Sequence, residues 1–290
     1  MAVVKKYKYQ VIIIPPSVPL ILYGVTAGVS VSKLFIAGII PGILIGLSFM
    51  AVSYVIALNN DYKAKERTNV KKALIAFKDS FFALLMPFII LGGIYGGIFT
   101  PTEASVVAVV YGFLVGAFIY RELSLKQFKE IFVSSAVTSS VIMLLIATAS
   151  IFGMILTRER VPHLIATMIG DSGLSNIVVI LLVVLFLLIV GTFMETIASI
   201  IILTPLLVPI AQSLGMDLVH FGIIMIVNLA IGLITPPVGV NIFVGAQVGK
   251  VSFDRLVRAL LPFIIMMIVD VLLIVFIPSI SMYLANMFDH

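Results

Sequence analysis

The chain has 290 residues, of which 62% are hydrophobic and only 11% are charged, and it contains no cysteine. A soluble globular domain has about 45–50% apolar and about 25% charged residues, so this composition excludes that class and indicates an integral membrane protein. The lack of cysteine excludes disulfide bonds and thiol catalysis. The formal net charge of +5 comes from loops, so it concerns membrane orientation and predicts no nucleic-acid partner.

The apolar runs are continuous rather than alternating, which predicts an all-α polytopic membrane protein and excludes a membrane β-barrel. In chain order, the expected spans are 34–58, 81–99, 104–120, 134–156, 221–234 and 259–284. The run 177–211 is too long for one span and is interrupted by Gly191, Glu195, Pro205 and Pro209. Because prolines break helices, a re-entrant helical hairpin is expected there.

Basic residues gather in two short segments between the expected spans. Six lysines and arginines lie between Asn60 and Asp79, and the second segment holds Arg121, Lys126 and Lys129. Lysine and arginine in short loops favour the cytoplasmic side. The two spans between these segments return the chain to the same side, so both segments are predicted to face the cytoplasm.

Two apolar segments that are broken by paired prolines align without a gap. Superposing Pro15 and Pro16 on Pro236 and Pro237 also matches two glycines and one further proline in each segment. The matched pairs are Gly24 with Gly245, Gly28 with Gly249, and Pro41 with Pro262. Two successive prolines unwind a helix, and breaks at corresponding points of an inverted repeat are typical of secondary transporters.

The segment GLITPPVGVN, Gly232 to Asn241, contains one of these expected breaks. Glycine permits close backbone approach, the prolines end a half-helix, and Thr235 and Asn241 offer side-chain oxygen. Carbonyls at the C-terminal end of a half-helix suit a sodium ion. The alternative is a kinked helix with a structural role only.

Glu195 is an ionisable group inside an apolar run, which by default marks a pathway or a buried pair. The alternative is that it lies in water at the mouth of the hairpin and orients the loop. Hydroxyl groups and prolines of residues 191–210 and 232–241 complete a set of candidate substrate or gating residues. The set is Glu195, Thr196, Thr204, Pro205, Pro236, Pro237 and Asn241.

Asp270 is a lone acid in the apolar stretch MIVDVLLI. It could transfer a proton, or it could pair with a neighbouring helix or a partner subunit. The three histidines have no metal-ligand spacing, so no metal other than sodium is expected. No catalytic motif is found, so the chain is not expected to be an enzyme, and no cofactor beyond the coupling ion is expected.

Several ordered stretches, IIIPPSVPLILYGV, LFIAGIIPG, FTPTEAS and NLAIGLITPPVGVNIFV among them, resemble the large membrane subunit of tripartite ATP-independent periplasmic (TRAP) transporters. The resemblance implies an inverted-repeat, elevator-type importer of carboxylates, of the dicarboxylate, keto acid or sialic acid type, in symport with sodium. It also implies two partners, a periplasmic solute-binding protein and a small membrane subunit, in the cytoplasmic (inner) membrane of a bacterium or archaeon.

By the same resemblance, one sodium site would use backbone oxygens of Gly191, Gly232 and Val238 and oxygen from Thr235. The other site would be incomplete and would include Ile14 and Pro16. Family members begin with further spans and a first hairpin, and Val11 stands where the matching repeat has Gly232. The chain is therefore expected to be a truncated product or half of a split subunit that does not transport alone.

The resemblance divides the chain into three parts. Residues 1–58 would be the remnant of the first transport repeat, 59–170 scaffold helices with the basic loop, and 171–290 the second transport repeat. Two alternatives stay open: a standalone sodium–carboxylate symporter, and a non-transporting fragment that binds only the small subunit.

Overall fold

The computed structural model describes residues 14–59, 69–171 and 173–288, and within these ranges all regular elements are helices. Seven of the helices are long and apolar enough to cross a membrane. The predicted fold class, an all-α polytopic membrane protein, is confirmed.

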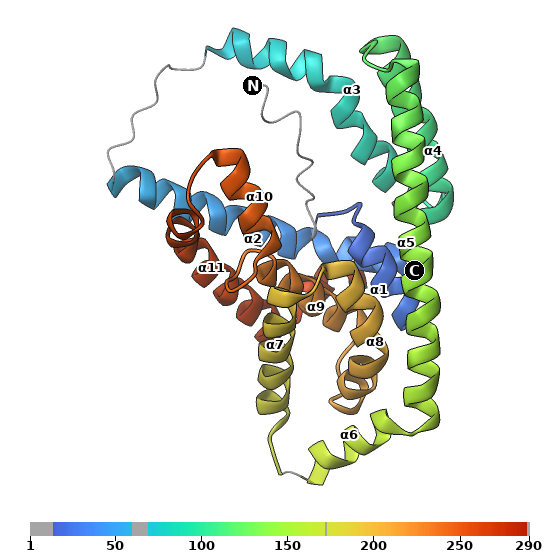
Figure 1. Cartoon of the computed structure of the whole chain (residues 1–290), viewed down its shortest axis with the longest axis vertical. Helices are drawn as coiled ribbons and strands as arrows, with labels where there is room; N and C mark the ends of the chain where they lie inside the picture. The colour runs from blue at the N-terminus through green and yellow to red at the C-terminus, as the bar shows by residue number, and fades with distance from the viewer. Residues whose placement is uncertain (1–13, 60–68, 172, 289–290) are drawn as a thin grey trace. The chain divides into compact units, whose positions relative to one another are not determined.

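Figure 1 labels the main helices. In chain order the helices are α1 Val18–Ala27, α2 Val31–Asn59, α3 Val70–Tyr95, α4 Pro101–Leu114, the π-helix η1 Val115–Ile119, α5 Leu125–Arg158, α6 Val161–Asp171, α7 Asn176–Phe193, α8 Thr196–Ser213, α9 Leu218–Gly232, α10 Val240–Gly249, α11 Phe253–Phe276 and α12 Ser279–Met287.

The chain divides into two compact units. One contains Met1–Tyr54 and Leu144–His290, and the other contains Val55–Met143. The first and third predicted parts fall almost entirely in the same unit. The division at residues 58 and 170 stays a prediction.

In the first unit, α9 is the central helix. It packs against α1, α7, α8, α11 and α12, and Met225 and Val227 in its middle are fully buried. A helix that is apolar on every side is stable only when it is surrounded, and α9 is such a helix. The C-terminal end of α9 is therefore held among the surrounding helices.

The predicted repeat is confirmed by the helices that follow the two proline pairs. Helices α1 and α10 each have 10 residues, and each is followed by a residue in the left-handed region, Gly28 with φ 69° and Lys250 with φ 52°. Each then leads into a longer helix, α2 or α11, with a proline inside it, Pro41 or Pro262. Both Pro–Pro bonds are cis.

In the second unit, α3 packs against α4. The Tyr111 hydroxyl donates to the carbonyl of Phe82 at 2.7 Å. Helix α4 begins with a capping box in which Thr100 and Glu103 each accept a hydrogen bond from the other's backbone N–H. These contacts fix the antiparallel connection between the two helices.

Helix α3 begins earlier than predicted, at Val70, because the Asn69 side chain caps it by accepting from the Lys71 N–H. The lysines from Lys71 to Lys78 therefore lie on a helix and not in a loop, which corrects that part of the prediction. The earlier part of the predicted loop, residues 60–68, lies outside the described residues.

Prolines are less disruptive than predicted at two places and more disruptive at a third. Pro205 and Pro209 lie inside α8, so the prediction that they break the helix is wrong. The hairpin is nevertheless present, because the chain turns at Met194 and Glu195 between α7 and α8. The span predicted for 259–284 is present with other bounds: α11 runs from Phe253 and ends at Phe276, since residues before Pro278 are driven out of the helical region.

Candidate functional site

Helices α7 and α9 touch through their backbones at two glycines near their C-terminal ends. A Cβ atom added to Gly232 would lie 2.3 Å from the carbonyl carbon of Gly191, and one added to Gly191 would lie 3.2 Å from the Cα atoms of Gly232 and Leu229. Glycine is the residue that allows such an approach. Two of the predicted sodium ligands are therefore in direct contact.

The segment after α9 folds back onto the end of α7. Thr235 donates its N–H to the Gly232 carbonyl at 3.0 Å and its hydroxyl to the Ile231 carbonyl at 2.7 Å. The Gly239 N–H donates to the Thr192 carbonyl at 3.4 Å. Gly239 has φ 51°, a left-handed conformation that favours glycine.

The four predicted sodium ligands thus come from one small region. Gly191 and Gly232 are in contact, and Thr235 is hydrogen-bonded to Gly232. Val238 directly precedes Gly239, whose N–H donates to the end of α7. The last carbonyls of a helix lack intrahelical partners and carry the negative end of its dipole. Two helix ends and a hydroxyl oxygen therefore concentrate oxygen atoms at this crossing.

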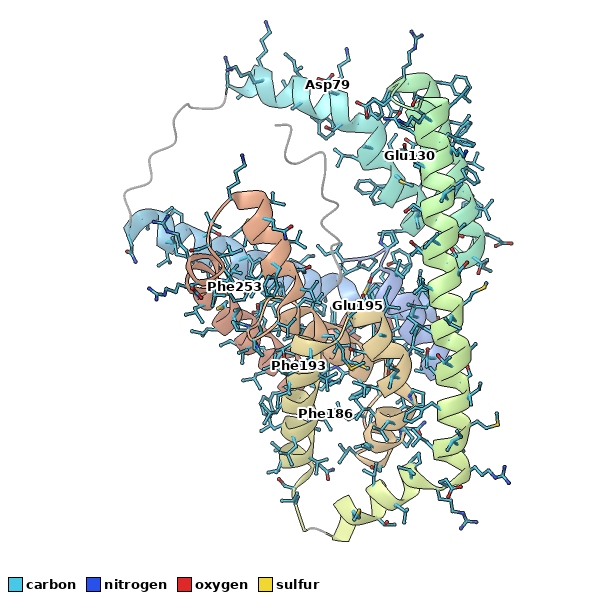
Figure 2. All side chains as sticks on the ribbon, in the orientation of Figure 1. Asp79, Glu130, Phe186, Phe193, Glu195 and Phe253 are labelled. Atoms are coloured by element: carbon cyan, nitrogen blue, oxygen red, sulfur yellow. The ribbon has the colours of Figure 1, made fainter. Side chains whose placement is uncertain are left out.

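Glu195 lies at the turn between α7 and α8 (Figure 2). It is the N-cap of α8, and its carboxylate accepts from the N–H groups of Ile197 at 2.8 Å and Ala198 at 3.2 Å. The side chain is exposed. This arrangement agrees with the alternative in which Glu195 lies at the hairpin mouth and orients the loop, and its role as a gating residue stays a prediction.

Thr196, the first residue of α8, differs from Glu195 in its surroundings. It is 2% exposed, and its hydroxyl oxygen has no hydrogen-bond partner among the described residues. A buried hydroxyl without a partner is costly. The hairpin tip therefore offers an unused polar atom beside the start of a helix.

The other candidate gating residues do not share one place. Thr204 is fully buried, and its hydroxyl donates to the Ile200 carbonyl at 2.6 Å, in the core between α8 and α9. Pro205 lines a cavity of about 300 Å³ with residues of α1 and α5. Pro237 and Asn241 are exposed and Pro236 is half-buried, in the segment after α9 and at the start of α10.

The first proline pair has a different environment. The Ile14 side chain lies over Gly42, where an added Cβ would be 2.9 Å away, and Pro16 is exposed. Ser17 follows as the N-cap of α1. Val11, the counterpart of Gly232, lies outside the described residues.

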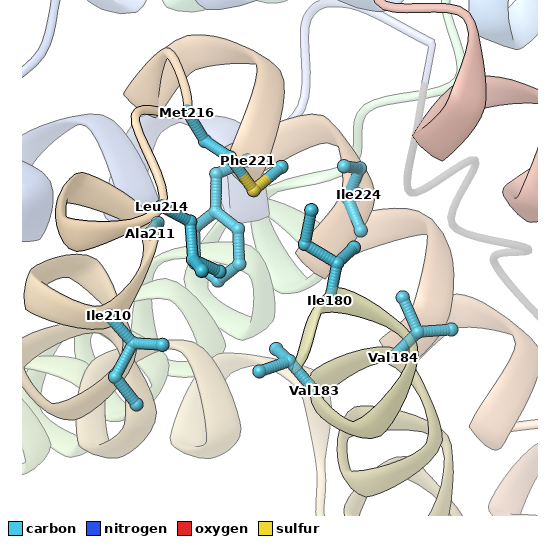
Figure 3. A pocket seen from close by; sticks show the side chains of 9 residues that line it. All are labelled: Ile180, Val183, Val184, Ile210, Ala211, Leu214, Met216, Phe221 and Ile224. Atoms are coloured by element: carbon cyan, nitrogen blue, oxygen red, sulfur yellow. The ribbon is translucent and has the colours of Figure 1, made fainter. Parts of the chain in front are cut away.

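One narrow cavity lies among α7, α8 and α9 (Figure 3). All of its lining side chains are apolar, for example Ile180, Leu214 and Phe221. Sites for small solutes need a few polar groups that fix orientation. This cavity therefore does not suit a carboxylate.

Three long-range contacts of the first unit were not expected from the sequence. Tyr23 donates its hydroxyl to the Leu218 carbonyl at 2.7 Å, and the ring of Tyr23 fills the space above Gly222. His220 Nδ1 lies 2.5 Å from the Ser281 hydroxyl. Tyr23 and Leu218 are far apart in sequence, so only the departure of Tyr23 from its repeat counterpart, Val244, could have signalled the contact.

The third contact concerns one of the alternatives for Asp270, pairing with a neighbouring helix. Ser48 of α2 donates its hydroxyl to Asp270 Oδ1 at 2.8 Å, and Asp270 is 0% exposed. Asp270 therefore pairs with a neighbouring helix.

The seven described helices that are long and apolar enough to cross a membrane define a multi-pass membrane protein, and its repeat and broken helices are typical of secondary transporters. The sequence model of one family, described as "Tripartite ATP-independent periplasmic transporter, DctM component", matches residues 10–280. The chain belongs to this family.

Individual relatives agree with this assignment. The chain is 46% identical over 276 residues to the isethionate TRAP transporter permease protein DctMQ of Oleidesulfovibrio alaskensis, covering 95% of this chain and 44% of the relative. It is 42% identical to the C4-dicarboxylate TRAP transporter large permease protein DctM of Pseudomonas aeruginosa, covering 95% and 64%. It is 37% identical to the sialic acid TRAP transporter large permease protein SiaM of Vibrio cholerae, covering 95% and 65%. The chain thus spans less than two thirds of the length of these relatives, all of which are named as permeases.

Proposed function

We propose that this chain is part of the large membrane subunit of a sodium-coupled importer of small carboxylates in the cytoplasmic membrane of a bacterium or archaeon. A periplasmic binding protein would deliver the solute, and a small membrane subunit would accompany the chain. Membership of the family supports this proposal. Two of the relatives described above are named for carboxylates, a C4-dicarboxylate and sialic acid.

The observation that carries the proposal is the backbone contact between Gly191 and Gly232. It brings together the C-terminal ends of two helices in a membrane protein, with Thr235 bonded beside them. Sodium needs several oxygens at once, and carbonyls at half-helix ends provide them. We therefore assign Gly191, Gly232, Val238 and Thr235 as its ligands, and Ile14 and Pro16 as the remaining part of a second site.

The hairpin tip is the proposed solute-facing surface. The N-terminal end of α8 carries a positive partial charge, which favours an anion, and the buried Thr196 hydroxyl beside it would donate to the anion only after the tip opens. The Glu195 carboxylate at the same tip repels a bare carboxylate. Sodium bound at the neighbouring crossing offsets that repulsion, which links binding of the ion to binding of the solute.

Uptake into liposomes tests this function. Because the chain spans 64% of the Pseudomonas aeruginosa relative, it is joined to the N-terminal part of that permease and reconstituted with a small subunit and a binding protein. Labelled succinate and sialic acid are offered under an inward sodium gradient or an equal potassium gradient. We expect uptake of at least one solute with sodium only.

Three outcomes would contradict parts of the proposal. Equal uptake under both gradients would remove sodium coupling. Uptake that persists without the binding protein would favour a standalone symporter. No uptake by this assembly, with normal uptake by the intact relative in the same liposomes, would favour a fragment that only binds the small subunit.

A further inference from the structure

Asp270 is the acid that the proposed mechanism leaves unused. It lies inside α11 and is fully buried. Its Oδ1 atom accepts from Ser48, which is 6% exposed, at 2.8 Å. Its Oδ2 atom is buried and has no hydrogen-bond partner among the described residues.

No cation neutralises this carboxyl group in the described part of the chain. The titratable or charged groups on α11 and on the helices packed against it are Lys33, Tyr54, His220, Lys250, Asp254, Arg255, Arg258 and Tyr283. No hydrogen bond or ion pair joins any of them to Asp270 in the described ranges. Arg258 is about 18 Å away along α11 by the helical rise, Lys33 is about 22 Å from Ser48 along α2, and His220 faces Ser281.

An unpaired carboxylate in a membrane interior is costly, because its charge is desolvated and nothing compensates it. A proton removes that charge, and it binds to a single oxygen atom of the carboxyl group. A sodium ion needs several oxygens, and the described contacts supply only the carboxyl group and one hydroxyl. The geometry therefore favours a proton over a metal ion.

We propose that Asp270 is a proton-binding site, with the proton on Oδ2 and the Ser48 hydroxyl donating to Oδ1. This proposal does not rest on sodium coupling or on the identity of the solute. Acids inside membrane-spanning helices commonly hold or relay protons. Through the Ser48–Asp270 pair, the molecule would respond to protons as well as to sodium.

The place of the site in the repeat gives it a consequence. Helices α2 and α11 are the equivalent long helices of the two repeats, and they also meet through Phe49 and Phe263, whose ring centroids are 5.5 Å apart. In the repeat alignment Asp270 corresponds to Phe49, so the site occurs once and not twice. Loss of the proton would leave a buried negative charge at this contact and favour separation of the two helices.

Infrared difference spectroscopy of the purified full chain tests the proposal. A protonated carboxylic acid has a carbonyl stretching band that is separate from the carboxylate bands and shifts in heavy water. We expect this band at neutral pH in the unmodified protein and its loss in Asp270→Asn. In Ser48→Ala the band should move to higher frequency, because the carbonyl oxygen loses its donor.

Carboxylate bands in place of the acid band would overturn the proposal. Loss of the acid band when sodium replaces choline at constant ionic strength would also overturn it, because the site would then bind sodium. If Asp270→Asn does not fold, aspartate labelled with carbon-13 at the carboxyl group assigns the acid band to aspartate, and a shift of that labelled band in Ser48→Ala assigns it to Asp270. An acid band that is not isotope-shifted would then belong to glutamate and would contradict the assignment.

Discussion

Replacing Gly232 by alanine should destabilise the first unit, because the added methyl group meets backbone rather than a movable side chain. The Cβ atom would lie 2.3, 2.5 and 2.6 Å from the carbonyl carbon, Cα and oxygen of Gly191, whereas ordinary contact begins at 3.4 Å. Helices α7 and α9 would have to separate by about 1 Å at their crossing to relieve overpacking of this kind.

The expected magnitude follows from two opposed effects. Overpacking costs about 1–3 kcal/mol, and contact with backbone belongs at the upper end of that range. Alanine regains about 1 kcal/mol of helix propensity relative to glycine. The free energy of unfolding should therefore fall by about 2 kcal/mol.

Gly46→Ala is the matched control. Gly46 lies inside α2, in the same unit, and an added Cβ would meet nothing within 4 Å. This variant should be neutral or gain up to about 1 kcal/mol. Equal stability of the two variants would show that the close crossing of α7 and α9 is wrong.

Thermal unfolding in detergent, followed by circular dichroism, measures the difference. The chain contains no tryptophan and no cysteine, so the helical signal is a better probe than tryptophan fluorescence or thiol labelling. A lower unfolding midpoint for Gly232→Ala than for Gly46→Ala is the expected result.

Three further predictions concern the cap, the core and the orientation. Glu195→Ala should lower the free energy of unfolding by about 0.5–2 kcal/mol while Glu195→Ser, another capping residue, restores most of it; equal loss in both would show that the cap does not stabilise α8. Tyr23→Phe should cost about 0.5–1.5 kcal/mol in thermal unfolding, because it removes the bond to the Leu218 carbonyl; no loss would contradict that bond. In intact cells a membrane-impermeant thiol reagent should label Ile98→Cys and spare Lys126→Cys, and the reverse pattern would invert the predicted topology.

Composition and apolar runs were sufficient to predict the long helices, because a spanning helix needs a long apolar stretch, but not the short helices α1, α6, α10 and α12. Their ends were less predictable. The first turns of α3 and α5 carry lysines outside the membrane-length apolar runs, so both helices begin earlier than the hydrophobic pattern indicates. Pro205 and Pro209 remain helical because packed neighbours in a membrane protein can satisfy the freed backbone groups.

The candidate site was predictable where local chemistry is specific. Glycines at a helix end and a Thr-Pro-Pro break pointed to the region around Gly232, and the structure joins it to Gly191. The Ser48–Asp270 pair was not predictable, since its two residues are 222 positions apart and a single serine in an apolar helix carries no signal. Hydrogen bonds between distant helices depend on which helices pack together in the fold, and local sequence does not show that.

Sodium-dependent thermal stabilisation tests the central claim most directly. Sodium that binds only the folded chain should raise its stability by about 2.7 kcal/mol at 100 times the dissociation constant, relative to choline. Thr235→Val should abolish this increase. Thr26→Val is its control, because both hydroxyls donate to the carbonyl four residues earlier, at 2.7 and 2.8 Å. Stabilisation that survives in Thr235→Val, or is absent from the unmodified chain, would contradict the assigned site.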